Sequence, residues 1–297
     1  MNLNIGGGYM EWEKAKTIVI VFLVILNSIL GFLWYKNSLK YTLDDEQKKN
    51  IITLLENKDI SLNTDFIEKH DPMKKLELTV NLYDERDILK IFFKEGASPE
   101  NKGDNYRPVY ETGDEVLAIN QNIILYSSNM KGEKLALDRK AALKLCQDFI
   151  DKMGDKGKGY KLDIVPEDIS QGGTIIYTQR INKNIIYNNY IKFTVGEYGI
   201  SNVEYSYGLP VGYSGDTREI ASCDEALFTF MVTIRNETTE KISIEKIDLV
   251  YFKEEDTQTG FTAVPCYRVL YKRENTPEGS YNIMLINAYT NKIEGHE

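Results

Sequence analysis

The chain has 297 residues, a formal net charge of -9 and a hydrophobic content of 42%, which supports a folded core and excludes a largely disordered chain. The acidic balance argues against a nucleic-acid partner, because phosphate binding requires clustered lysine and arginine side chains. With two histidines and three cysteines, the sequence favours neither a metal site nor a His-based triad, and we expect no cofactor.

The first element is an apolar segment at residues 17–35, which reads TIVIVFLVILNSILGFLWY and carries no charge. A helix rises about 1.5 Å per residue, so this length nearly crosses a hydrocarbon core of about 30 Å. Trp34 and Tyr35 stand at its end, where aromatic rings favour the membrane interface. A cleaved signal peptide is the alternative, but the run is longer than about 15 residues and no small-residue cleavage site follows. We therefore predict a retained transmembrane helix in the lipid bilayer.

The orientation of this helix is indicated by the size of its flanks more than by their charge. Two lysines stand before the span and two after it, so the positive-inside rule gives nearly a tie. Residues 1–16 form a short head, and a large polar body follows residue 35, which is the usual order of a signal-anchor protein. We expect a single-pass protein of the cell membrane with its N-terminus in the cytoplasm and its body outside.

Two residues in the middle of the span suggest a face for helix contact. Asn27 is costly in hydrocarbon unless it finds a hydrogen-bond partner, and a neighbouring helix can supply one. Gly31 lies four residues later on the same face and permits close helix approach. The alternative is that the Asn27 side chain bonds to its own helix. We predict Asn27 and Gly31 as partner-binding residues.

The first nine residues, MNLNIGGGY, precede a second methionine at position 10. Codons for three consecutive glycines begin with GG, and they lie where a purine-rich ribosome-binding site would precede a bacterial start codon. Our hypothesis is that translation starts at Met10. Sequencing the N-terminus of the natural protein tests it, because a peptide from residues 2–9 would reject it.

The N-terminal region of the body, residues 42–130, is predicted to be α+β. Residues 44–55 favour a short helix with Asp44 and Asp45 at its N-terminus, where acidic side chains stabilise the helix dipole. Its apolar face is predicted to consist of Ile51, Leu54 and Leu55. Apolar patterns predict strands at residues 76–83, 88–93, 115–119 and 123–127, with a turn-rich loop at residues 96–104.

The remaining sequence repeats one order of elements, in two modules at residues 135–210 and 217–297. The first begins with an amphipathic helix at residues 137–153, and the second with a helix at Ser222 and Glu225, a capping-box pair. The second helix is expected to bury Ala226, Leu227, Phe230, Met231 and Ile234. Strands are predicted after the first helix at residues 160–165, 174–181, 184–195 and 200–207, and after the second at residues 241–253, 264–272 and 281–288. A helix followed by an antiparallel meander, found twice, predicts an α+β fold.

The carboxylates and glycines of the body do not form a recognisable catalytic or ligand-binding pattern. Acidic clusters stand at strand ends or turns, where charge is normally solvated, at residues 84–87, 167–168 and 254–256. Acid–base catalysis needs a cleft that shifts one pKa, and calcium binding needs alternating oxygen ligands around a glycine turn. The Gly172–Gly173 pair lacks the Lys and Ser/Thr of a phosphate loop and predicts a turn. The sequence therefore predicts no enzyme.

The cysteines and tyrosines have ordinary structural interpretations. Cys146 and Cys223 fall on helices and Cys266 in a strand, so buried free thiols are favoured, with a bridge between Cys223 and Cys266 left open. Tyrosines in the strands favour cross-strand packing, although a solvent-facing row could bind a partner. These tyrosines are Tyr177, Tyr187, Tyr190, Tyr198, Tyr205 and Tyr207.

Two parts of the sequence resemble the YycI family. The opening MEWEKAKTIVIVFLVILN at residues 10–27 is similar to the family's start, and residues 225–227, 244–251, 264–269 and 286–291 are similar to its closing module. That module typically has a Pro-x-Trp-Arg strand and an Asn-Ala-x-Thr-Gly turn. Here Tyr267 replaces the tryptophan and Asn291 replaces the glycine; tyrosine keeps an aromatic ring, and asparagine also tolerates a left-handed turn.

The resemblance implies a non-enzymatic regulator with two PepSY-like modules in its body. Such a protein would act with a sister YycH-type protein on a sensor histidine kinase of the WalK (YycG) type, which governs cell-wall metabolism in Gram-positive cells. Regulation would pass through transmembrane-helix and extracellular contacts. The alternative function is a membrane-tethered binding or inhibitor module for an extracellular hydrolase or peptide.

Overall fold

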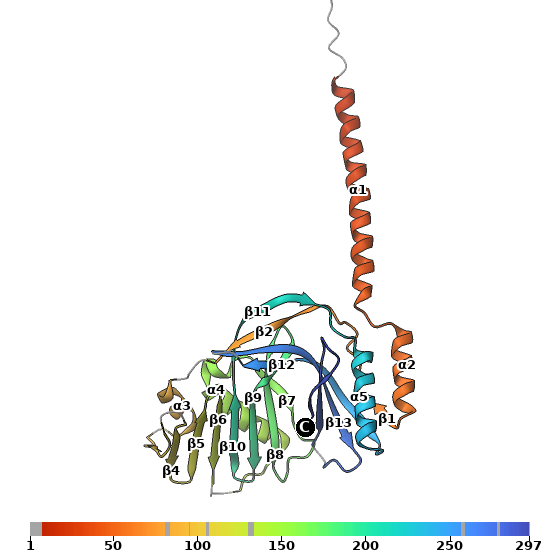
Figure 1. Cartoon of the computed structure of the whole chain (residues 1–297). Coiled ribbons are helices and arrows are strands. Elements are labelled where there is room, and N and C mark those ends of the chain that lie inside the picture. The colour runs from red at the N-terminus through yellow and green to blue at the C-terminus, as the bar shows by residue number, and fades with distance from the viewer. Residues whose placement is uncertain are drawn as a thin grey trace, which may run out of the picture.

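The computed structural model describes residues 8–80, 84–94, 96–104, 107–129, 134–256, 259–277 and 280–296. One long helix, α1 (Gly8–Lys40), projects from an α+β body that contains the other elements (Figure 1). Within α1, the segment Trp12–Lys36 has a mean hydropathy of 2.5 and is long and apolar enough to cross a membrane. The hydropathy window in this segment is not buried against the body. The structure therefore has the predicted long apolar helix, which suggests a membrane anchor, and an α+β body.

The body consists of one large sheet with helices packed on it. Its N-terminal elements are α2 (Asp45–Glu56), β1 (Ile60–Leu62), β2 (Met73–Thr79), α3 (Glu85–Phe92), β3 (Glu100–Asn101), β4 (Val109–Thr112), β5 (Glu115–Asn120) and β6 (Ile123–Ser128). The next are α4 (Arg139–Lys152), a short 3-10 helix (Gly154–Gly157), β7 (Tyr160–Ile164), β8 (Gly173–Ile181), β9 (Asn184–Gly196), β10 (Gly199–Ser206) and β11 (Leu209–Arg218). The last are α5 (Cys223–Glu237), β12 (Ile242–Asp256), β13 (Gly260–Arg273), β14 (Asn282–Asn287) and β15 (Ile293–His296).

The main path of the sheet does not follow the order of the chain. The hydrogen-bonded order is β11-β2-β13-β12-β9-β10-β6-β5-β4-β3, with β14 and β15 added beside β13, and β8 and β7 added beside β9. Strand β9 meets β12 in parallel through only two registered pairs, Val250 with Ile185 and Tyr251 with Ile186. This short seam joins the strands that follow α4 to those that follow α5.

The first core lies between α4 and the strands β5 to β10. Asp138 caps α4 by accepting a hydrogen bond from the backbone of Ala141, as the start of an amphipathic helix requires. Ala142, Cys146 and Ile150 follow one another on the buried face of α4. Helix α4 ends at Lys152, and Gly154, two residues later, has a φ of 59°, which suits glycine.

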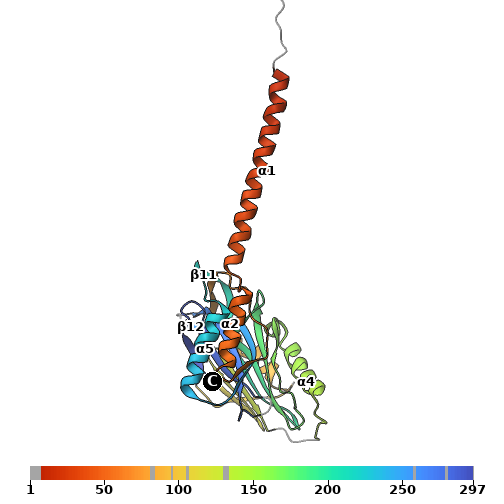
Figure 2. The ribbon, with the colours of Figure 1, turned by 90° about the vertical axis from the view of Figure 1, so that its right-hand side faces the viewer.

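The second core lies under α5, with α2 packed beside it. Ser222 and Glu225 form the predicted capping box, and all five apolar residues predicted on the inner face are buried. Helix α2 has a second capping box, formed by Asp44 and Gln47. It buries Ile51 and Leu55, whereas the predicted third residue, Leu54, is 45% exposed. Figure 2 shows α4 on one side of the body and the pair α2 and α5 on the other.

The predicted strand at residues 88–93 is wrong, because this segment is helix α3. Asp84 caps the helix by accepting a hydrogen bond from the backbone of Arg86. Ile88, Ile91 and Phe92 are buried, at the spacing of one helix face. A short apolar run is compatible with either a strand or a helix, and the cap at Asp84 favours the helix.

Five of the described strands were not predicted: β1, β3, β4, β11 and β15. Strand β3 lies in the segment predicted as a loop, and β15 ends the chain as a partner of β14. Strand β11 pairs with β2, although its sequence LPVGYSGDTR has the proline and glycines of a loop. The predicted strand at residues 76–83 begins earlier, as β2, and its residues 81–83 lie outside the described residues.

Candidate functional site: the anchor helix and its junction with the body

The predicted contact residues lie on an exposed face of α1. The Asn27 side chain donates a hydrogen bond from Nδ2 to the carbonyl oxygen of Leu23 at 2.9 Å, and the Ser28 hydroxyl donates to Val24 at 2.8 Å. Asn27 therefore bonds to its own helix in this structure. Apart from Gly31 itself, its two chain neighbours and the nearby backbone of its own helix, no heavy atom lies within 4 Å of the position that a Cβ would take at Gly31, which leaves room for the surface of another helix.

The end of α1 is fixed to the body by an ion pair that the sequence did not indicate. Lys40 donates a hydrogen bond from Nζ to Oε1 of Glu219 at 2.6 Å, and the Tyr41 hydroxyl donates to the same oxygen at 2.9 Å. The hydrogen bond to Glu219 raises the pKa of Lys40, and the hydrogen bonds from Lys40 and Tyr41 lower the pKa of Glu219. Glu219 directly follows β11, so the anchor helix is bonded to the end of an edge strand.

Backbone hydrogen bonds secure the next residues of the chain. The amide of Leu43 donates to the carbonyl of Glu68 at 2.8 Å, and the amide of His70 donates to the carbonyl of Tyr41 at 3.0 Å. Thr42 forms an isolated antiparallel bridge with Lys69. The segment that links α1 to α2 is thus paired with the chain before β2, and the orientation of the helix end is determined by the body.

A buried ion cluster connects the strand that follows α4 with the strands that follow α5. Arg268 of β13 donates from Nη1 and Nη2 to the two carboxylate oxygens of Asp163 in β7, at 2.6 and 2.8 Å. Arg268 also bonds to Asp248 of β12, its cross-strand partner. Lys246 lies 3.2 Å from a carboxylate oxygen of each aspartate. The side chains of Arg268 and Asp163 are 1% and 0% exposed.

Electrostatics favour the charged form of this cluster. Burial opposes ionisation of Asp163, but its hydrogen bonds and charge contacts with Arg268, and the charge of Lys246, hold the pKa of its carboxyl below the usual value. Burial also opposes the charge on Arg268, and the two aspartates outweigh it and raise the pKa of the guanidinium. Arg268 is the arginine of the Pro-x-Trp-Arg motif described above, so this motif position has a structural role.

The two substituted motif positions also have clear structural roles. Tyr267 is fully buried, and its hydroxyl donates to the carbonyl oxygen of Ala221 at 2.8 Å, just before α5. Asn291 has a φ of 52°, in the left-handed region that the turn requires. Its replacement of glycine is therefore compatible with the fold, as the sequence indicated.

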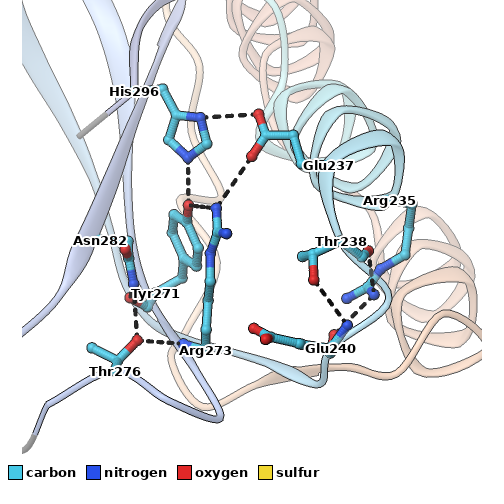
Figure 3. Close-up of polar contacts among 9 residues, drawn as sticks. All are labelled: Arg235, Glu237, Thr238, Glu240, Tyr271, Arg273, Thr276, Asn282 and His296. Atoms are coloured by element: carbon cyan, nitrogen blue, oxygen red, sulfur yellow. Dashed lines mark hydrogen bonds and ion pairs between the residues drawn. The ribbon is translucent and has the colours of Figure 1, made fainter.

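A second polar cluster holds the C-terminal strand against the end of α5 (Figure 3). Nδ1 of His296 lies 3.0 Å from a carboxylate oxygen of Glu237, and Nε2 contacts the hydroxyl of Tyr271. Arg273 donates to Glu237 at 3.2 Å and to the Tyr271 hydroxyl at 3.3 Å. Tyr271, at the base of the cluster, is fully buried. The arrangement attaches β15 to the body.

The neighbouring contacts in Figure 3 close the turns around this cluster. Arg235 donates from Nη1 to the carbonyls of Thr238 and Glu240, at 3.0 and 2.9 Å, where α5 ends. The Thr276 hydroxyl accepts hydrogen bonds from the Arg273 amide, at 2.8 Å, and from the Asn282 side chain, at 3.0 Å. These bonds stabilise the chain ends that support the cluster.

Acidic residues in the clusters noted in the sequence form helix caps, ion pairs and turn hydrogen bonds with nearby groups. Asp84 caps α3, Glu254 forms an ion pair with Lys75, and Asp168 accepts hydrogen bonds from the Ser170 backbone and hydroxyl, which lower the pKa of its carboxyl. Among the described residues, no group of three His, Cys, Asp or Glu side chains is arranged to hold a metal ion. Gly172 has a φ of 92° in the turn before β8.

The cysteines are buried free thiols, including the pair for which a bridge was left open. Burial raises the pKa of Cys146 to about 12 and that of Cys223 to about 11, so neither thiol is an activated nucleophile. Of the six strand tyrosines, Tyr177, Tyr205 and Tyr207 are buried. Packing therefore accounts for half of that set, and only Tyr198 is clearly exposed, at 38%.

Several known proteins and one family resemble this chain. The sequence matches the family described as "YycI protein" over residues 40–289. No curated protein matches the sequence. The fold is similar to that of an uncharacterized protein from Eubacterium rectale, at 13% sequence identity and a TM-score of 0.51, over 80% of this chain and 90% of that one.

Two solved structures with lower scores are also similar. The C-terminal domain of YpeB from Bacillus megaterium has 12% identity and a TM-score of 0.40, over 72% of this chain and 94% of that one. YycH from Bacillus subtilis has 12% identity and a TM-score of 0.40, over 77% of this chain and 60% of that one. The family match extends from the last residue of α1 through both cores and includes Arg268 and its two aspartate partners, and the chain belongs to the YycI family.

Proposed function

We propose that this protein is a non-enzymatic, membrane-anchored regulator of a sensor histidine kinase of the WalK (YycG) type, which controls cell-wall metabolism. Membership of the YycI family supports this proposal, and the observation that carries the mechanism is the direct bonding of α1 to the body. We further propose that a YycH-type protein takes part in the assembly. The N-terminus would lie in the cytoplasm and the body outside the cell membrane.

The proposed mechanism couples the membrane helix to the outer domain. A kinase helix would pack against the face of α1 that carries Asn27 and Gly31, and exchange the internal bond of Asn27 for an interhelical one. The body would then favour one of two kinase arrangements, which requires a different affinity for each. A coupling free energy of about 1–3 kcal/mol is typical of such regulation.

The organisation of the body into two PepSY-like modules, at residues 135–210 and 217–297, is part of the proposal. Separate buried clusters beneath α4 and α5 support it. Each helix begins with its own cap, at Asp138 and Ser222, so each module has an independent local start signal. Residues 42–130 would be shared between the modules, because α2 packs beside α5 and α3 joins the core under α4.

A bacterial two-hybrid assay with the full chain and the kinase tests the helix face. The double variant Asn27→Leu, Gly31→Leu is expected to reduce the signal strongly, because a leucine side chain at position 31 would hold the helices apart. The matched control Ile25→Phe, Ile29→Phe adds bulk about half a turn away on α1 and should leave the signal unchanged. Undiminished binding by the first variant would remove this face from the proposal.

Crosslinking of the tagged full-length protein in its native membrane tests the partner. Recovery of a sensor kinase together with a YycH-type protein is the expected result. Recovery of an extracellular hydrolase or peptide without the kinase would favour the membrane-tethered inhibitor instead. Such an inhibitor would have to bind through surfaces other than Tyr177, Tyr205 and Tyr207, because these side chains are buried.

A further inference from the structure

A groove of about 700 Å³ lies between α2 and the extended chain that follows it, residues 60–68. Helix α2 comes directly after the base of α1, at the flank of the body (Figure 1). The floor of this α2 groove is apolar, with Ile52 and Leu55 on the helix and Ile60, Leu62 and Phe66 on the facing segment. Ligand sites commonly have volumes of about 300–1,000 Å³, so the groove is large enough to take several side chains.

The rim of the α2 groove is acidic. Its charged side chains are one lysine, Lys48, and three carboxylates, on Glu56, Asp65 and Glu68. Lys48 donates a hydrogen bond from Nζ to Oε1 of Glu68 at 2.6 Å, and this ion pair connects the two walls of the groove. Glu56 and Asp65 are exposed, and neither forms an ion pair with another described residue. The free charge of the rim therefore favours a cationic partner and disfavours an anionic one.

The segment that forms the second wall of the groove has an unpaired backbone edge. Strand β1, at the start of this segment, pairs with β12 and with no other strand in the described part of the chain. The backbone of residues 64–66, which follows β1, makes no hydrogen bond to any residue that the structure describes. An extended segment with unpaired amides and carbonyls can accept a peptide as an additional strand.

Other occupants match these features less well. Sites for small ligands contain buried polar groups that fix the ligand, whereas the buried residues of this groove, Leu55 and Ile60, are apolar. A lipid chain has no backbone groups that could pair with residues 64–66, and the free carboxylates of the rim repel anionic headgroups. The chemistry of the groove is therefore that of a peptide-binding site.

We propose that the α2 groove binds an extended segment of a partner protein in which a large apolar side chain stands next to lysine or arginine. The apolar side chain enters between Ile52, Leu62 and Phe66, and the basic side chain reaches Glu56 and Asp65. Main-chain hydrogen bonds to the unpaired edge supply part of the affinity, and the alternation of side chains along a strand directs the apolar ones into the groove.

Selection from a random heptapeptide phage library on the full-length protein in phosphatidylcholine nanodiscs tests this inference, with empty nanodiscs used to remove lipid binders. The enriched peptides are expected to combine an aromatic or large aliphatic residue with lysine or arginine. Fluorescence anisotropy of a labelled synthetic copy of one such peptide then measures its dissociation constant. The double variant Glu56→Lys, Asp65→Lys should raise this constant about tenfold, because it replaces both free carboxylates by cations.

The matched control is Asp148→Lys, Glu274→Lys, which changes the net charge equally at two exposed positions outside the groove. It should leave the dissociation constant unchanged. Far-UV circular dichroism of both variants checks that the body is folded. Binding of the peptide to the unmodified protein should also slow hydrogen exchange at the amides of residues 62–66, because an added strand pairs with this edge.

Three outcomes would overturn the inference. Equal affinity of the groove variant and the control variant would place the peptide elsewhere on the body. Enrichment of peptides without basic residues, or of none beyond those that bind empty nanodiscs, would remove the proposed occupant, and disulfide crosslinking of two copies through Asp65→Cys would then assign the groove to a second copy of the chain. Unchanged exchange at residues 62–66 would exclude strand addition. The assay contains no kinase, so its result is independent of the proposed regulatory function.

Discussion

Arg268 and Asp163 form a bidentate ion pair across the body, although 105 positions separate them in the chain. The pair connects β13 to β7, two strands that belong to opposite halves of the sheet and share no ladder. Beside it, the backbone connection of the two halves through β9 and β12 has only two registered pairs. The side-chain cluster therefore contributes to holding the halves in one arrangement.

Removing one partner of this cluster is expected to be strongly destabilising. Arg268→Ala leaves Asp163 buried without its guanidinium, and we expect a loss of about 3–5 kcal/mol in the free energy of unfolding. Urea denaturation followed by circular dichroism measures it. Lys246→Ala is the matched control, because Lys246 is 37% exposed and contacts the same two aspartates. A loss as small in Arg268→Ala as in the control would mean that the buried pair has no net structural role.

The same cluster predicts the direction of one pH effect. Because the pKa of Asp163 is lower in the folded protein than in the unfolded chain, its contribution to stability is complete above the unfolded value. That contribution is lost as the pH falls through the lower folded value, so the acid limb of the stability curve should be steep below about pH 4. Thermal unfolding from neutral to acid pH measures this limb. Asp163→Asn should flatten it, and an identical slope in the variant would assign the acid sensitivity to other carboxylates.

The junction between α1 and the body is expected to control local order without affecting global stability. Lys40 and Glu219 are both exposed, so Glu219→Ala should leave the unfolding temperature of the body unchanged. It should accelerate hydrogen exchange at the amides of Leu43 and His70, which secure the following backbone. Glu219→Gln is the control, because its amide oxygen can still accept the hydrogen bond from Tyr41. Equal exchange rates in all three proteins would show that the backbone bonds are sufficient alone.

The thiols are expected to react only after the body unfolds. Cys146, Cys223 and Cys266 are buried, and burial raises the pKa of each thiol. A thiol reagent at neutral pH should therefore modify none of them in the native protein and all of them in denaturant. Mass spectrometry of the labelled protein counts the modified sites. Rapid native labelling at any one position would show that the core opens locally there.

Local signals in the sequence predicted much of the fold. The capping box at Ser222 and Glu225, the amphipathic face of α4 and the alternating strands after each helix all depend on residues close together in the chain, and each is present. One failure, the strand predicted at residues 88–93, lies where the local cap at Asp84 begins α3, whereas β11 depends on a distant partner. Strand β11 forms because β2 supplies its ladder, and no local pattern in LPVGYSGDTR indicates this.

The candidate site residues also divide into those that local sequence indicates and those that only the fold brings together. Asn27 and Gly31 were identified as candidates because polar and small residues in a span are conspicuous in a sequence, and their role in binding stays a prediction. The Lys40–Glu219 pair and the Arg268–Asp163 pair join residues that are far apart in the chain. Charged residues of this kind are common on any surface, so only the folded arrangement separates the structural pairs from the solvated ones.

The chain passes from α1 into paired backbone within two residues of Lys40, with no flexible linker between them. Rotation of α1 about its own axis would therefore rotate the whole body about the same axis. In the proposed membrane arrangement, the helix face that meets a partner helix would then also determine which side of the body faces that partner. A partner that contacts both the helix and the body would therefore fit only one rotational position of the protein about the α1 axis. A small rotation of α1 would also move the far end of the body much further than the helix surface.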